Sequence, residues 1–358
     1  MIPSDTDHPE RETRKPKSRL RRIAGVVVPL AIAVALLVGV LPAIADFSKV
    51  WEIIRGLAVP EILLLLLLAA WNILTYQLVV MAALPGLPLS QAFMVGQIST
   101  AVSNTVPAGS AVGVGVTFAM FSSYGYSADS IGIAAALTGL WNTFVKLGLP
   151  IAALAILAFQ GNPNAAMLGA AVVGLAVLTA AVVALVLVVS SDRLARAVGR
   201  AGQRVATSFA RALRRGPFSG WDDALSGFRH KTAGVLQDRW LLLTAATLLS
   251  HGSLFALLLV SLRVSGVPAD AVTWSEILAA FAFVRLVTAL PVTPGGIGLV
   301  EVGMTGALVV AGGSQPAVVA GVLIYRALSY AIQIPIGAAC WVVWRAGVRR
   351  QRRTATTA

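Results

Sequence analysis

The sequence has little of what metal sites and disulfide scaffolds require. It contains one cysteine, Cys340, inside an apolar run, and three histidines, His8, His230 and His251, that lie far apart. A single cysteine forms no intramolecular disulfide, and the histidine spacing matches no ligand set of a zinc site. We therefore expect no disulfide framework, no metal site and no cofactor.

Nucleotide-binding and catalytic motifs are missing as well. The sequence holds no G-x-x-x-x-G-K-[ST] loop, and Gly295-Gly296 opens no phosphate cradle after a strand, which excludes ATP hydrolysis by this chain. Paired carboxylates and nucleophile–base pairs are not evident either, so we expect no catalytic residues and no enzyme activity.

Charged residues are scarce: 12% of the chain is charged and 57% is hydrophobic, whereas roughly a quarter of a soluble domain is charged. Each long apolar run exceeds the roughly 20 residues that a helix needs to span a bilayer. The first run is too long for the core of a signal peptide and is interpreted as a membrane helix. These observations predict an all-α polytopic membrane protein. The runs are Ile23–Ala45, Leu57–Leu84, Ile131–Phe159, Ala165–Val189, Trp240–Leu262 and Ala317–Trp344.

The basic residues, which give a net charge of +13, are strongly clustered. Residues 1–22 hold seven Lys or Arg, residues 191–239 hold ten, and Arg345–Arg353 holds five. Basic clusters flank membrane helices on the cytoplasmic side and attract anionic lipid headgroups. We therefore expect a multi-pass protein of the cell inner (plasma) membrane with both termini in the cytoplasm, and no nucleic-acid partner.

The central basic segment has helical periodicity. Within Asp192–Arg215 the arginines fall on one face and apolar residues on another. This pattern is typical of an amphipathic helix in the inner-leaflet interface, although an ordinary solvated helix packed on the membrane domain gives the same pattern.

With the basic clusters inside, residues 91–122 must start and end in the cytoplasm, and residues 275–311 must start and end outside. The expected layout has two membrane halves joined by a cytoplasmic loop. Its parts are a basic tail (1–22), a first membrane half (23–190), a basic amphipathic loop (191–239), a second membrane half (240–345) and a basic tail (346–358).

Both of these segments are interrupted near their centres by proline and glycine, which stop a helix. The arms on each side have about 15 residues and reach roughly 22 Å, too short for an untilted crossing. Two re-entrant hairpins satisfy these constraints, and pairs of full tilted helices remain an alternative. The residues expected at the breaks are Pro107, Gly109, Pro291, Pro294, Gly295, Gly296 and Gly298.

The two interrupted segments also resemble each other at an offset of 187 residues. Pro107 maps to Pro294, Gly109 to Gly296, and Ser127 to Ser314. Since one hairpin enters from each side, the pattern indicates an inverted-topology repeat, in which broken helices meet at a substrate site. The expected fold thus has about six full transmembrane helices plus two re-entrant hairpins.

Four ionisable residues lie within apolar segments: Lys146, Arg285, Glu301 and Arg326. Charges at such depth usually mark a pathway, and three cations against one anion favour an anionic ligand such as a lipid phosphate. A structural ion pair between Arg285 and Glu301 is an alternative, and Lys146 can snorkel towards the interface.

Polar residues cluster before the first break, and they either line a hydrated groove or join helices through hydrogen bonds. His251 is more often a packing residue than a functional one. Asn104, next to the break, is a candidate translocation residue with the four charged ones. The polar residues are Asn72, Tyr76, Gln97, Ser99, Thr100, Ser103 and Asn104.

The run Leu290–Glu301 (LPVTPGGIGLVE), followed by Leu323–Arg326 (LIYR), resembles the lysylphosphatidylglycerol synthase transmembrane-region family, and Asn104–Gly109 (NTVPAG) is similar to its first-half motif. Members are flippase-like integral membrane proteins, and the best understood move an aminoacylated phospholipid between leaflets while a separate soluble domain makes it. One departure is that Thr138–Asn142 stands where the family often has a Glu-Arg pair. Lys146 is the candidate substitute.

The resemblance implies a lipid translocase that moves an anionic or phosphate-bearing lipid between leaflets of the inner membrane. No aminoacyl-transferase domain follows the last helix. The partners expected are therefore membrane lipids, especially those with anionic headgroups, and a separate lipid-modifying enzyme. The alternative function is a membrane scaffold or regulatory subunit for a cell-envelope glycosyltransferase or lipid synthase.

Overall fold

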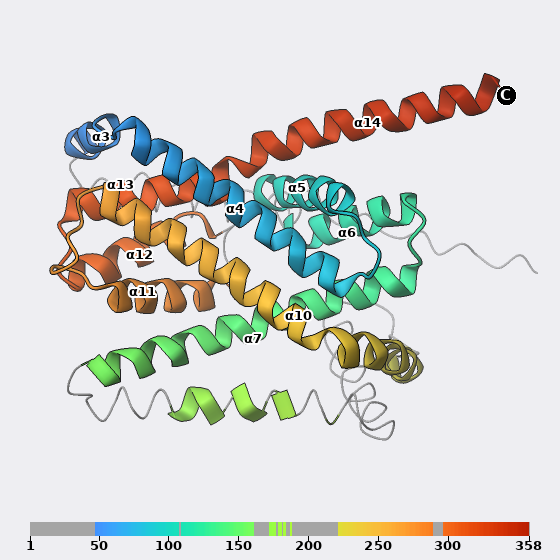
Figure 1. The fold of residues 1–358 in the computed structure, drawn as a ribbon, viewed down its shortest axis with the longest axis horizontal. Helices are drawn as coiled ribbons and strands as arrows, with labels where there is room; N and C mark the ends of the chain where they lie inside the picture. The colour runs from blue at the N-terminus through green and yellow to red at the C-terminus, as the bar shows by residue number, and fades with distance from the viewer. Residues whose placement is uncertain are drawn as a thin grey trace, which may run out of the picture.

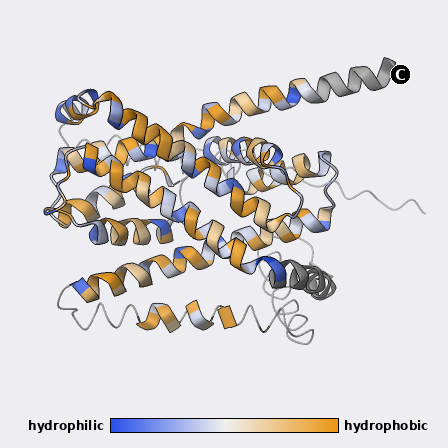
Figure 2. Ribbon diagram, viewed as in Figure 1, coloured by the Kyte–Doolittle hydropathy of each residue, from blue (hydrophilic) through white to orange (hydrophobic). Residues whose placement is uncertain are grey.

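The computed structural model describes residues 47–106, 109–160, 221–288 and 296–357, together with short helical pieces between 172 and 187. Within these ranges all regular secondary structure is helical, and the helices are largely apolar along their length (Figure 2). The predicted first span 23–45, most of the span 165–189 and the amphipathic segment 192–215 lie outside the described residues. So do Pro107, Pro291, Pro294 and Gly295 of the breaks.

Four helical segments of the described chain are long and apolar enough to cross a bilayer: 59–83, 128–160, 238–264 and 315–347. They coincide with the predicted runs 57–84, 131–159, 240–262 and 317–344. The first is α4 (Val59–Ala83), the second α7 (Ala128–Gln160), and the third is part of α10 (Trp221–Val264). The fourth comprises α13 (Gln315–Arg326), the π-helical turn η3 (Ala327–Ala331) and the part of α14 (Gln333–Thr357) that ends at Gly347.

Two helix boundaries and one short helix differ from expectation. Helix α10 begins at Trp221, within the predicted loop 191–239, and α14 continues to Thr357, through the predicted tail. Because neither extension contains proline, each can prolong an already nucleated helix beyond its apolar span. The short helix α3 (Phe47–Arg55) was not predicted, and it buries Val50 against Val319 and Ala320 of α13.

Both predicted interrupted segments form two helices on either side of a break. The first segment contains α5 (Leu89–Thr105) and α6 (Gly109–Ser123), and the second contains α11 (Trp274–Val287) and α12 (Leu299–Val310). The arms have 17, 15, 14 and 12 residues. At 1.5 Å per residue they reach roughly 18–26 Å, less than the roughly 30 Å of a hydrocarbon core. Re-entry from one side remains a prediction.

The two halves of the chain pack reciprocally. Helices α4 and α10 lie side by side and run in opposite directions (Figure 1). Helix α5 packs on α14, and α11 packs on α7. A shift of 187 residues carries Ala128–Gln160 onto positions 315–347, so each pair of short helices contacts the long span of the other half. Figure 1 shows the two pairs towards opposite ends of the long helices.

Small residues allow the closest of these approaches. A methyl group on Gly337 of α14 would meet Ala101 and the carbonyl group of Gln97 on α5, and one on Gly113 of α6 would meet the hydroxyl of Ser103. Membrane helices commonly pack through such small residues, because lipid provides no hydrophobic drive between them. These contacts fix α5 between α6 and the last span.

Candidate functional site

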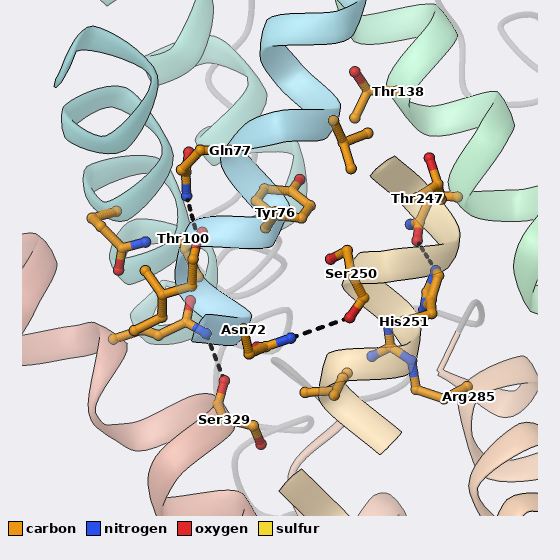
Figure 3. Close-up of a pocket in the computed structure, with 16 residues that line it drawn as sticks. Asn72, Tyr76, Gln77, Thr100, Thr138, Thr247, Ser250, His251, Arg285 and Ser329 are labelled. Carbon is orange, nitrogen blue, oxygen red and sulfur yellow. Dashed lines mark hydrogen bonds between the residues drawn. The ribbon is translucent and has the colours of Figure 1, made fainter. Parts of the chain in front are cut away.

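A polar cavity of about 260 Å³ lies between the two halves of the molecule (Figure 3). Its lining comes from α4, α5, α7, α10, α11, the π-helical turn and α14, so neither half forms it alone. The lining residues are Asn72, Ile73, Tyr76, Gln77, Val79, Gln97, Thr100, Thr138, Asn142, Thr247, Ser250, His251, Leu254, Arg285, Ser329 and Gln333.

The α4–α10 pair forms one wall. Asn72 donates from Nδ2 to the backbone oxygen of Ser250 at 3.2 Å and to Oγ of Ser253 at 2.8 Å. Tyr76 lies one turn after Asn72, and Ser250 and His251 lie one turn after Thr247. At this spacing the polar side chains share one face of otherwise apolar helices. The opposite faces carry leucines such as Leu67 and Leu241, which are 68% and 64% exposed and suited to lipid contact.

Helix α7 contributes Thr138 and Asn142, again one turn apart. Nε2 of His251 lies 2.9 Å from Oδ1 of Asn142, which joins α10 to α7 at the edge of the cavity. His251 is 5% exposed. Lys146 follows one turn after Asn142 on the same face of α7; it is half-buried and is not among the lining residues.

Arg285, near the end of α11, is the charged side chain of the described lining. Figure 3 shows it extending towards Ser250 and His251. Its Nε is buried and has no hydrogen-bond partner among the described residues, and the same holds for Oε1 of Gln77 and Oε1 of Gln97. Buried polar atoms are normally paired, and an uncompensated buried cation is costly. The guanidinium group of Arg285 is therefore suited to an anionic ligand.

The carboxylate of Glu301 is shared between two donors next to this cavity. Its Oε2 accepts from the backbone N–H of Gly298 at 2.7 Å, and its Oε1 accepts from Nε of Arg326 at 2.6 Å. Glu301 thus caps the N-terminus of α12 and also forms an ion pair with α13. The alternative in which Glu301 pairs with Arg285 is therefore not what the structure contains.

Arg326 connects this ion pair to the first half of the chain. Its guanidinium carbon lies 4.4 Å from the centre of the Tyr330 ring, and the Tyr330 hydroxyl donates to the backbone oxygen of Asn104 at 2.6 Å. Asn104 donates from Nδ2 to the backbone oxygen of Tyr330 at 3.4 Å. These contacts link the start of α12 to the end of α5, so they join the two breaks through a π-helical turn. Single π-helical turns frequently occur at functional sites.

The structure places four of the five predicted translocation residues in two adjoining places. Arg285 lines the cavity, and Asn104, Glu301 and Arg326 form the network that joins the breaks. Lys146 lies one turn beyond the lining residue Asn142. Of the predicted break residues, Gly296 and Gly298 have positive φ angles of 71° and 82°, which glycine adopts readily. Gly109 begins α6 and lies against the backbone of Ser103, where a methyl group would not fit.

The polar row before the first break contributes both to the cavity lining and to hydrogen bonds between helices, and Asn72 does both. Asn72, Tyr76, Gln97 and Thr100 line the cavity. Ser99 instead joins α5 to α6 through the hydroxyl of Thr117 at 2.7 Å, and Asn104 contacts Tyr330.

Sequence reasoning assigned no site role to several lining residues. The available signal was polar spacing of three or four residues within an apolar run, which indicates one polar helix face. The residues are Thr138, Asn142, Thr247, Ser250, Ser329 and Gln333. Within the described ranges no group of three His, Cys, Asp or Glu side chains gathers that would hold a metal ion.

Long apolar helices around a polar interior cavity define an integral membrane protein. A model of the family described as the lysylphosphatidylglycerol synthase TM region matches residues 26–337. The chain therefore belongs to this family, and it is a membrane protein involved in lipid biology. No curated protein matches the chain at a significant level.

Proposed function

We propose that this protein is a lipid translocase that moves an anionic, phosphate-bearing lipid between the leaflets of the inner membrane, with both termini in the cytoplasm. The observation that carries the proposal is Arg285, a cation without a hydrogen-bond partner at Nε, in a polar cavity between the two halves. Intramembrane cations of this kind usually mark a substrate pathway.

The charge balance favours an anionic headgroup. Lys146, Arg285 and Arg326 lie in the apolar segments together with one carboxylate, Glu301, and that carboxylate is engaged by Arg326. A phosphate would offset the surplus positive charge and accept charge-assisted hydrogen bonds from the Arg285 guanidinium.

The arrangement of the helices supports movement between leaflets. The two interrupted segments are linked through the last span, by the Glu301–Arg326 ion pair on one side and the Tyr330–Asn104 contacts on the other, next to a cavity that both halves line. In transporters built from inverted repeats, discontinuous helices meet in this way at the substrate site, and one half rocks against the other. The reciprocal contacts of α5 with α14 and of α11 with α7 are those that an inverted repeat would make.

A flux assay tests the proposal. The full chain is reconstituted in vesicles with acyl-chain-labelled phosphatidylglycerol, and the outer-leaflet label is quenched chemically. If the protein moves lipid, the quenched fraction of the label should rise over time above the fraction that lies in the outer leaflet at the start. In protein-free vesicles the quenched fraction should stay at that starting value. Folded protein that moves no anionic lipid, isolated with a stoichiometric lipid synthase or glycosyltransferase, would overturn the proposal in favour of the scaffold function.

The proposed inverted topology predicts the labelling of single cysteines in a Cys340→Ser background. Because α5 and α6 are proposed to enter from the cytoplasm, Leu89→Cys and Ser127→Cys should be protected from an impermeant thiol reagent applied to intact spheroplasts. Ala269→Cys and Ser314→Cys, at the ends of the second hairpin, should be labelled. All four positions are exposed, so accessibility itself is matched.

Permeabilised cells provide the control for this experiment, since all four cysteines should then react. Labelling of Ser127→Cys in intact spheroplasts would contradict the inverted arrangement, because the two hairpins would then open to the same side.

A further inference from the structure

The lining of the cavity is unusual for its neutral polar side chains. It contains five carboxamides and six hydroxyl groups, but a single cation, and no carboxylate lies among the lining residues that the structure describes. The carboxamides are Asn72, Gln77, Gln97, Asn142 and Gln333, and the hydroxyl groups belong to Tyr76, Thr100, Thr138, Thr247, Ser250 and Ser329.

The sequence extends this observation beyond the described lining. It contains no Asp or Glu between Glu61 and Asp129, between Asp129 and Asp192, or in residues 302–358. Both breaks are free of acidic residues apart from Glu301, which already accepts from Gly298 and Arg326. An amine in the cavity would therefore meet Arg285 without an available carboxylate.

We infer that the cavity selects a lipid whose headgroup combines one phosphate with neutral hydroxyl groups, and that it discriminates against a headgroup bearing an amino group. This inference rests on the proposed function and names its substrate class. Arg285 supplies charge-assisted donors for the phosphate. The carboxamides and hydroxyl groups of the lining, such as those of Asn72, Gln333 and Thr100, can accept from and donate to the hydroxyl groups of a polyol.

The size of the cavity narrows the class of lipid headgroup further. Its 260 Å³ lies just below the roughly 300–1,000 Å³ of drug-sized ligand pockets. A phosphate with glycerol or one sugar ring fits this volume better than an oligosaccharide does. Sites built to hydrogen-bond a hydroxyl group reject analogues that lack it, because the polar atoms of the site are then left unpaired.

Three acyl-chain-labelled lipids test the inference in the same reconstituted vesicles: phosphatidylglycerol, phosphatidic acid and lysyl-phosphatidylglycerol. Phosphatidylglycerol should move roughly tenfold or more faster than each of the others, since each lacks one favourable interaction or adds one repulsive charge. Equal or faster movement of lysyl-phosphatidylglycerol would overturn the discrimination against amines. Equal movement of phosphatidic acid would overturn the role of the hydroxyl groups. If none of the three lipids moved, the proposed function itself would fail.

A single carboxylate should change the preference. Gln97→Glu keeps the size of the side chain and places a negative charge in the lining, so it should raise the rate for lysyl-phosphatidylglycerol relative to phosphatidylglycerol by about tenfold. Gln315→Glu makes the same change at an exposed position of α13 and should leave the ratio unchanged. An unaltered ratio in folded Gln97→Glu would contradict the assignment of this cavity as the headgroup site. Should that variant fail to fold, the comparison of the three lipids on the native protein still decides the inference.

Discussion

Replacing Arg285 by glutamine is expected to reduce the rate of anionic-lipid transport by about 30-fold or more, since loss of a buried charge-assisted interaction costs roughly 2–5 kcal/mol. Arg285→Lys keeps the charge but loses the planar fork of donors, so it should retain part of the activity. The thermal stability of Arg285→Gln should equal or exceed that of the native protein. The reason is that Nε of Arg285 has no hydrogen-bond partner in the described structure, and removing such a group relieves a desolvation cost.

The combination of lost transport and retained stability separates a substrate contact from a structural role. Arg55→Gln provides the matched control, because Arg55 lies exposed on α3 and contacts the ring of Trp51. Its transport rate should equal that of the native protein in the same flux assay. If Arg285→Gln transports anionic lipid at the native rate, the anionic-headgroup mechanism is refuted. If that variant does not fold, Arg285 has a structural role instead.

The sequence alone predicts the four spans that the structure describes, because composition decides them. A run such as Leu57–Leu84 has no stable environment other than lipid or a protein core, and proline and glycine end helices wherever they occur. The breaks and the isolated Arg285 are therefore visible in the printed sequence. The start of α10 and the end of α14 are not visible in this way, because the extension of a helix beyond its apolar span depends on nucleation by that span.

The partners of the buried groups could not be predicted in the same way. Glu301 lies 16 positions from Arg285 and 25 from Arg326, and both distances permit an ion pair. The packing of α13 against α12 decides between them, and the π-helical turn that follows brings Tyr330 to Asn104. The cavity lining likewise depends on which face of α7 and of α10 turns towards the interior of the molecule. The spacing of polar residues shows that they share a face of a helix, but it does not show whether that face points inward.

The ion pair of Glu301 has the largest expected effect on stability. Glu301→Gln can still accept from the N–H of Gly298, but its amide nitrogen cannot accept from Arg326. Arg326, whose side chain is 13% exposed, then loses this carboxylate, and the expected destabilisation is about 3–5 kcal/mol, measured as chemical or thermal unfolding in detergent. Contact with the Tyr330 ring offsets part of this loss.

Two further variants isolate the cause of that loss. Glu276→Gln changes the equivalent third residue of α11, where the carboxylate accepts from the backbone N–H of Thr273 at 2.8 Å and has no arginine partner among the described residues. It should cost at most about 1 kcal/mol, the value of a helix cap. The double change Glu301→Gln with Arg326→Gln removes both charges, so it should recover most of the stability lost in Glu301→Gln. If the double variant is instead less stable than either single variant, the carboxylate acts mainly through Gly298 and the start of α12, and the ion pair contributes little.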